Sequence, residues 1–165
     1  MEQEKWRLKA QSCSQILYNQ NCSCAVAYNA KQMLDLWLYT YLICDANGSV
    51  ILDELLPLNP IFVGPVLLPI SSFMRCCGPE KEMRYFEERN RFELRVHELM
   101  KAITHGADLP PLLLHYFNGE FDLYDGAHRY EAYLRLGVSQ IPVIIWTFDQ
   151  TDSDDFCKRY SPVFL

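Results

Sequence analysis

The stretch "DLYDGAHRYEAYLRLG", residues 122–137, joins the end of a strand, a glycine turn and the start of an amphipathic helix. Its opening residues complete a predicted strand that ends at the acid Asp125. Gly126 follows, and the pattern after it predicts a helix over about 127–136 that ends at Gly137. The chain is therefore expected to pass from sheet to helix at this one glycine.

The same turn carries the residue types that bind phosphate. A helix start exposes unpaired backbone N–H groups and the positive end of the helix dipole, and a preceding glycine lets a phosphate approach closely. Arg129 adds a planar guanidinium, expected largely at the surface, and His128 adds a hydrogen-bond donor. Asp125 could orient Mg²⁺, accept a proton from a hydroxyl or simply cap the helix. Spacing alone leaves a phosphate site and an ordinary capped helix equally open.

The flanking sequence predicts a small α+β domain. Asn118-Gly119 is a strong hairpin signal because both residues tolerate positive φ. The elements expected after residue 61 are a buried strand over 62–70, a helix with an apolar stripe at Phe92, Val96, Leu99, Met100 and Ile103, hairpin strands over 112–117 and 120–125, the helix over 127–136, and a buried strand over 141–148.

The N-terminal third is harder to interpret. Residues 35–55, "DLWLYTYLICDANGSVILDEL", favour a hairpin that turns at Asn47-Gly48, because Trp, Tyr, Thr and Ile are common in strands. A helix through 30–44 is the competing interpretation. We expect residues 1–60 to form an N-terminal extension with a hairpin and a helix, and residues 61–165 to form the main domain.

Composition limits the function classes. The net charge of -6 and the pI near 5.2 argue against a protein that grips duplex DNA through its backbone. The apolar run over 36–44 is much shorter than the roughly 20 residues that cross a bilayer.

Seven cysteines, an odd number, suit a reducing compartment, so we expect free thiols and a cytoplasmic location. Neither Cys22-x-Cys24 nor Cys76-Cys77 has the spacing of a zinc knuckle, so no metal site is predicted.

Residues 125–146, "DGAHRYEAYLRLGVSQIPVIIW", with the preceding "LPPLLLHYFNGEFDLYD" and the upstream "VLLPISSF", resemble the ParB/sulfiredoxin superfamily. The mark of that superfamily is a G-x-H-R-x-x-A-type turn at a helix start. The resemblance covers about residues 63–148 and leaves the N-terminal third outside. It implies an α+β fold with a mixed sheet and packed helices.

The resemblance also implies roles for individual residues. Arg75 sits where sulfiredoxins have a basic residue near the phosphates, and Asp125 falls where the free-serine kinase branch has a catalytic acid. The residues implied as contacts of nucleotide phosphates are Gly126, Ala127, His128 and Arg129.

Two departures from the family pattern restrict the chemistry. Sulfiredoxins need a cysteine directly before the His-Arg pair, and Ala127 occupies that position here, which argues against sulfinic acid reduction. The kinase branch has a second acid after its first strand. Glu80 resembles it, at a longer spacing, and the competing acids are Glu82, Glu87 and Glu88.

The sequence thus predicts a nucleotide-binding ParB-like protein. One hypothesis is an enzyme, a phosphotransferase or nucleotide hydrolase that uses Mg²⁺ with ATP or CTP, with Asp125 and Glu80 as its acids. The alternative is a non-catalytic module that senses a nucleotide and signals to a protein partner through the N-terminal segment. DNA binding or nuclease activity ranks last because of the acidic charge balance.

Overall fold

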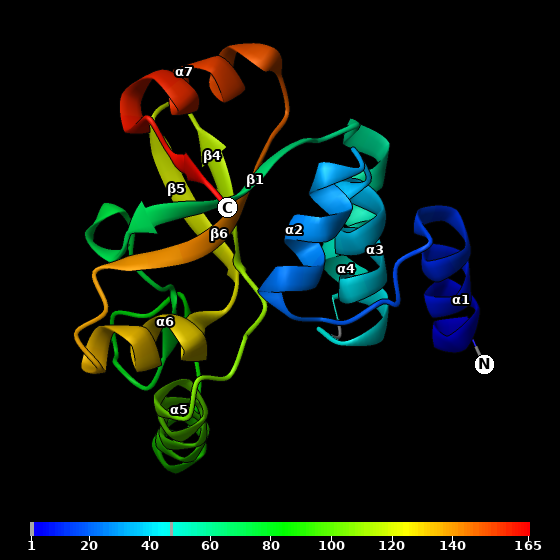
Figure 1. Ribbon diagram of the computed structural model, residues 1–165. Coiled ribbons are helices and arrows are strands. Elements are labelled where there is room, and N and C mark those ends of the chain that lie inside the picture. The colour runs from blue at the N-terminus through cyan, green and yellow to red at the C-terminus, as the bar shows by residue number, and fades with distance from the viewer. Residues whose placement is uncertain (1, 47) are drawn as a thin grey trace.

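A mixed sheet with helices packed on both of its faces forms the centre of the molecule (Figure 1). The computed structural model describes residues 2–46 and 48–165. The helices are α1 (Glu2–Ser14), α2 (Cys22–Ala30), α3 (Leu34–Cys44), α4 (Ser49–Leu55), α5 (Arg89–Thr104), α6 (Ala127–Arg135) and α7 (Gln150–Tyr160), with short 3₁₀ turns η1 (Leu56–Leu58) and η2 (Ile70–Ser72). The strands are β1 (Ile61–Pro69), β2 (Cys77–Gly78), β3 (Tyr85–Phe86), β4 (Leu112–Phe117), β5 (Glu120–Asp125), β6 (Gln140–Thr147) and β7 (Val163–Phe164).

The main sheet has five strands in the order β5-β4-β6-β1-β7. β4 runs parallel to β6, and the pairs β4–β5, β1–β6 and β1–β7 are antiparallel. The short strands β2 and β3 form a separate parallel pair. An α+β fold with a mixed sheet and packed helices is therefore confirmed.

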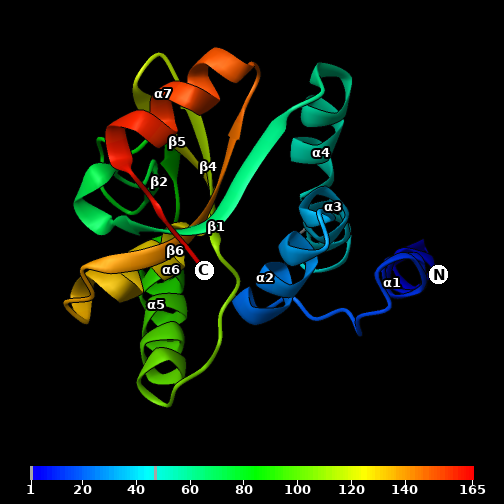
Figure 2. The ribbon, with the colours of Figure 1, turned by 45° about the horizontal axis from the view of Figure 1, so that its top comes forward.

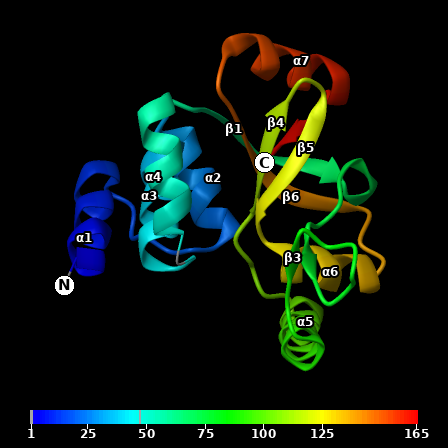
Figure 3. The ribbon, with the colours of Figure 1, turned by 180° about the vertical axis from the view of Figure 1, so that it is seen from behind.

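Two apolar cores lie on opposite faces of this sheet, because successive side chains of a strand point to opposite faces. Leu113 and Trp146 face α2 and α3, whose Tyr28, Trp37 and Leu38 complete the first core. The second core is formed with α6 and α7, and its sheet residues include Leu112, Leu114, Val143 and Ile145. Figure 2 shows the sheet between the N-terminal helices and the remaining helices, and Figure 3 shows the same separation from behind.

The predicted hairpin is confirmed at Asn118-Gly119, where φ is 50° and 83°. The predicted apolar stripe of 92–103 lies on α5, and Phe92, Val96 and Leu99 are buried. The strand predicted over 141–148 corresponds to β6.

The hairpin predicted over residues 35–55 is wrong, because this segment forms α3 and α4. The turn expected at Asn47-Gly48 includes residue 47, which lies outside the described residues. Trp37, Leu38, Tyr41 and Leu42 are buried at helical spacing. Strand-favouring side chains form a helix here because α3 packs against α1 and α2 as well as the sheet, and tertiary burial outweighs local propensity.

Within the described residues, no helix has the length and apolarity needed to span a bilayer. The seven cysteines carry free thiols.

Candidate functional site

The site begins at the turn between β5 and α6. β5 ends at Asp125 and α6 begins at Ala127, so the predicted strand, glycine and helix order is confirmed. Gly126 has φ 108° and ψ 22°, a conformation that side chains rarely adopt. A Cβ atom on Gly126 would lie 2.7 Å from the Cγ atom of Leu112. Both the backbone angle and the close packing therefore require glycine.

The start of α6 lacks a side-chain cap among the described residues. The N–H of Tyr130 donates to the Gly126 carbonyl at 2.8 Å, which closes the first helical turn. The backbone N–H groups ahead of it belong to Ala127, His128 and Arg129, and a first helical turn gives such groups no partner of its own. Unpaired amides at a helix start generally favour an anion.

Arg129 lies on the first turn of α6, as predicted, but its side chain is not at the surface. The residue is only 7% exposed. Its guanidinium donates to the Pro110 carbonyl at 2.7 Å, to the Tyr41 hydroxyl at 3.1 Å and to the Asp125 carboxylate at 2.5 Å. The surface expectation is wrong because the loop before β4 and the helix α3 cover the guanidinium and supply its acceptors.

Electrostatics keeps this buried group charged. Burial is the largest single effect and lowers the pKa of the Arg129 guanidinium, but Asp125 and Tyr41 together outweigh it, and the net pKa shift is upward. Burial raises the pKa of Tyr41, so its hydroxyl stays protonated and donates to Asp125 at 2.7 Å. Both donors reach the Oδ2 atom of Asp125, and its Oδ1 atom accepts no hydrogen bond from the described part of the chain.

His128 lies on the other side of the turn and pairs with Glu87. The His128 Nε2 atom is 2.8 Å from the Glu87 Oε2 atom. The Cys77 thiol lies 3.8 Å from the same carboxylate oxygen. Glu87, one of the four acids left open by the sequence, is thus the one that reaches the predicted phosphate turn.

Glu80 instead pairs with Arg75, at 2.7 Å between Arg75 Nη2 and Glu80 Oε1. This contact lowers the pKa of Glu80 to about 2, so the carboxylate is charged at neutral pH. Arg75 also donates to Glu131 on α6 at 2.9 Å and to the Cys77 carbonyl at 3.0 Å. Its charge is therefore balanced by two carboxylates, and its contacts tie the loop around β2 to α6.

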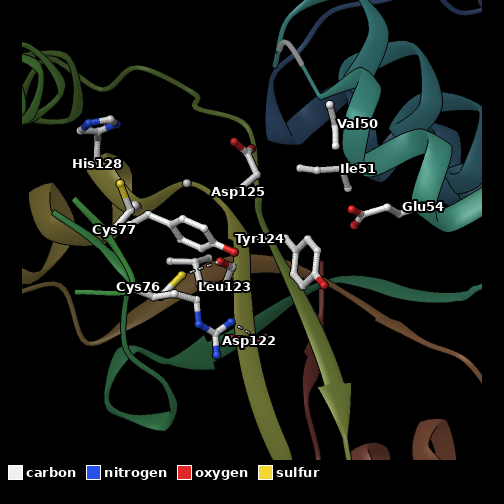
Figure 4. Close-up of a pocket in the computed structure, with 14 residues that line it drawn as sticks. Val50, Ile51, Glu54, Cys76, Cys77, Asp122, Leu123, Tyr124, Asp125 and His128 are labelled. Atoms are coloured by element: carbon white, nitrogen blue, oxygen red, sulfur yellow. Dashed lines mark hydrogen bonds and ion pairs between the residues drawn. The ribbon is translucent and has the colours of Figure 1, made fainter. Parts of the chain in front are cut away.

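Two cavities open on either side of the turn and share Asp125, Gly126 and His128. The larger measures about 450 Å³ and lies between the turn and α4 (Figure 4). The smaller measures about 270 Å³ and is bordered by α5 and by the loop before β4. The lining residues that the sequence did not point to include Val50, Ile51, Glu54, Arg84 and Tyr85 in the larger cavity, and Tyr41 and Arg95 in the smaller.

A divalent cation would find few protein ligands here. In the part of the chain that the structure describes, no group of three or more His, Cys, Asp or Glu side chains is placed to hold a metal ion. Asp125, with its unbonded Oδ1 atom, is the carboxylate that both cavities share. Mg²⁺ bound together with nucleotide phosphates needs only one or two carboxylates, so the residues fit Mg²⁺ as a companion of a nucleotide rather than as a resident ion.

Residues 82–155 match the family model of the ParB N-terminal domain, which confirms the resemblance to the ParB/sulfiredoxin superfamily for this segment. The chain is similar to the crystal structure of sulfiredoxin from Arabidopsis thaliana, with 23% identity, a TM-score of 0.39, and coverage of 60% of this chain and 98% of that one. It is also similar to the C-terminally truncated chromosome-partitioning protein ParB from Caulobacter crescentus complexed with CTP-gamma-S, with 20% identity and a TM-score of 0.36. That alignment covers 60% of this chain and 54% of the partitioning protein. No curated protein matches the sequence.

Proposed function

From the segment at residues 82–155 that matches the ParB N-terminal domain, we propose that this protein binds a nucleotide, with its phosphates at the start of α6. The observation that carries the proposal is the uncapped helix start behind Gly126, which borders two cavities. Free amides, the helix dipole and the His128 imidazole all favour an anion there. The cavity volume of about 450 Å³ is in the range of small-molecule sites.

Charge favours the smaller cavity for the phosphates. Its lining has two arginines, Arg95 and Arg129, against the two acids Asp45 and Asp125. The larger cavity has three acids against the single arginine Arg84. The Arg129 guanidinium already donates hydrogen bonds to Pro110, Tyr41 and Asp125. Arg95 is therefore the arginine of the smaller cavity that can still donate to a phosphate. Its ion pair with Glu98, at 3.4 Å, is exposed and costs little to break.

Arg95→Ala is expected to weaken nucleotide affinity by about tenfold or more, since one charge-assisted hydrogen bond contributes about 1.5–3 kcal/mol. Calorimetric titration with ATP, CTP and GTP in the presence of Mg²⁺ measures the affinity. Lys101→Ala is the matched control, because Lys101 is an exposed cation on the same helix and lines neither cavity. Equal affinities of the two variants would contradict the assignment of Arg95. A wild-type protein that binds none of the nucleotides at millimolar concentration would contradict nucleotide binding itself.

Catalysis is the second candidate, and the contact between His128 and Glu87 favours it. A carboxylate that orients an imidazole allows the imidazole to act as a general base. The His128 imidazole lies next to the amides that are expected to hold phosphate. Asp125 suits that role less well, because Arg129 neutralises it and two donors occupy its Oδ2 atom. Mg²⁺, if held by Asp125 and the phosphates, would neutralise negative charge on the phosphates. The reaction class is phosphoryl transfer or nucleotide hydrolysis.

Glu87→Gln tests this candidate. The amide can keep a hydrogen bond to His128 but cannot stabilise an imidazolium, so turnover is expected to fall by about 100-fold or more while nucleotide affinity changes little. The measurement is phosphate release from ATP and CTP with Mg²⁺, and Glu82→Gln, an exposed acid in the same loop, is the control. Wild-type turnover no faster than that of Glu87→Gln would exclude the role of Glu87 in the base, and a wild type that binds nucleotide without releasing phosphate would be a non-catalytic nucleotide sensor.

A sensing role has its own structural support. Tyr41 on α3 donates to Asp125 and accepts from Arg129, so the N-terminal helices contact the phosphate turn directly. A ligand that moves Asp125 would change this contact and could be read by a protein partner of the N-terminal helices.

A further inference from the structure

Five aromatic rings lie side by side on one face of the sheet. The His115 ring stacks on Trp146, with 3.9 Å between the ring centroids, and on Phe117, with 6.1 Å. Tyr124 and Phe148 meet both the His115 and the Trp146 rings edge-on, with centroids 4.8–6.2 Å apart. These five rings, here called the aromatic platform, come from β4, β5 and the end of β6, on the face that the N-terminal helices cover in part.

The outer rings of the platform are exposed, and the inner ones have unpartnered nitrogen atoms. Phe117 is 51% exposed and Tyr124 37%, whereas Trp146 is 2% exposed. Among the described residues, the buried Trp146 Nε1 and His115 Nε2 atoms have no hydrogen-bond partner. Buried polar atoms nearly always have one, and contiguous exposed rings mark interaction surfaces. The platform therefore has the properties of a binding surface rather than of a closed core.

Two carboxylates stand on the platform face of β5. Asp122 is opposite His115 in the β4–β5 ladder, and Glu120 is opposite Phe117. Directly opposed residues of antiparallel strands point to the same face of a sheet, so both side chains border the rings. The Asp122 side chain is 44% exposed, and Glu120 is exposed as well. A ligand that lies on the rings thus meets two hydrogen-bond acceptors.

A third carboxylate, that of Glu54 on α4, lies near Tyr124. The two residues line the larger cavity together (Figure 4). Burial raises the pKa of Tyr124, and the nearby Asp122 and Glu54 carboxylates raise it further, so the phenol stays neutral. Arg84 is the cation at this border, but its pair with Asp122 is exposed and long, at 3.5 Å, and costs little to break. The surroundings of the platform therefore favour a cationic ligand.

This charge decides between two ligands that suit an aromatic sheet face. Single-stranded nucleic acid stacks its bases on such rings but needs cations along its backbone, and the platform is bordered by carboxylates. A guanidinium stacks on aromatic rings and donates to a carboxylate through two parallel hydrogen bonds. We propose that the aromatic platform is a docking surface for an arginine-containing segment of a partner protein. The guanidinium lies over Phe117 or Tyr124 and donates to Glu120 or Asp122.

The probe is a capped hexapeptide of alternating glycine and arginine, titrated into the isotope-labelled full chain by NMR at about 150 mM salt, which screens long-range charge attraction. The indole N–H signal of Trp146 should shift, because its ring lies in the platform. Those of Trp6 and Trp37 should not, since Trp6 lies on α1 and the Trp37 indole donates to the Asn19 carbonyl at 2.9 Å. The corresponding lysine peptide should bind at least about threefold more weakly, because an ammonium makes no bidentate pair.

Two substitutions test the contacts. Phe117→Ala should weaken the affinity for the arginine peptide about threefold and Asp122→Asn about tenfold, the usual effects of losing one cation–π contact and one charge-assisted hydrogen bond. The controls are Leu94→Ala, at an exposed apolar residue of α5, and Asp154→Asn, at an exposed acid of α7. Both controls should keep the wild-type affinity.

Equal losses in Asp122→Asn and Asp154→Asn would show that the peptide follows the net charge, and would overturn the docking surface. An unchanged Trp146 signal, or no binding of the arginine peptide at millimolar concentration, would overturn it too. Tighter binding of oligothymidylate than of the arginine peptide would assign the rings to single-stranded nucleic acid instead. Nucleotide affinity should be the same in Phe117→Ala and in the wild type, because the platform does not include the start of α6. This proposal and the proposed function can therefore fail separately.

Discussion

Arg129→Ala is expected to lower the free energy of unfolding by about 3–5 kcal/mol, the usual effect of removing one partner from a buried ion pair. The substitution leaves the Asp125 carboxylate without its counter-charge. It also leaves the Pro110 carbonyl and the Tyr41 hydroxyl without a donor. For a chain of 165 residues this corresponds to a melting temperature lower by about 6–20 °C. Urea unfolding followed by circular dichroism measures the change.

The control is Arg159→Ala on α7, because Arg159 and Asp155 form an Arg–Asp pair with the same i,i+4 spacing as Arg129 and Asp125. The Arg159 side chain is 58% exposed and that of Arg129 9%. An exposed pair contributes about 0–1 kcal/mol, so the control should change stability little. Similar losses in the two variants would show that burial does not distinguish the pairs, and that Arg129 is not the structural anchor of the turn.

Gly126→Ala is expected to cost about 2–6 kcal/mol of stability. Strain from φ 108° contributes about 1–3 kcal/mol, and the collision of the new Cβ atom with Leu112 adds an overpacking cost of about 1–3 kcal/mol. The same substitution moves the backbone that should hold phosphate, so nucleotide binding should weaken in parallel. Urea unfolding and calorimetric titration of the same preparation measure the two effects.

Gly137→Ala separates the two causes of this loss. Gly137 follows the other end of α6 with φ 71°, and a Cβ atom there meets nothing within 4 Å. Only the backbone strain remains, so the expected loss is about 1 kcal/mol. If Gly126→Ala were no more damaging than Gly137→Ala, the close packing of Gly126 against Leu112 would have no energetic role.

Local signals predicted most of the elements after residue 61. Asn118-Gly119 determines the hairpin through its own backbone preferences, and Gly126 determines the break between β5 and α6 in the same way. These features depend on residues that are neighbours in sequence, and for that reason the sequence alone identified them.

The partners of the turn could not be predicted because they come from distant parts of the chain. Tyr41 and Asp125 are 84 positions apart, and no pattern in either segment points to the other. Glu87, and not Glu80, reaches His128 because of the way the loop around β2 and β3 folds back on α6. Glu80 forms an ion pair with Arg75 instead. The burial of Arg129 has the same origin, since its acceptors belong to α3 and to the loop before β4.

The alternation of Leu112, Leu113 and Leu114 along β4 has a consequence for any shortened form of the protein. Leu113 belongs to the core under the N-terminal helices, and its two neighbours belong to the core on the other face. A chain that began at β1 would present Leu113, Ile144 and Trp146 to water as one apolar surface, which invites self-association. We therefore expect the helical layer and the sheet to unfold as one cooperative unit, and a truncated variant that stays monomeric would need polar replacements at these sheet positions.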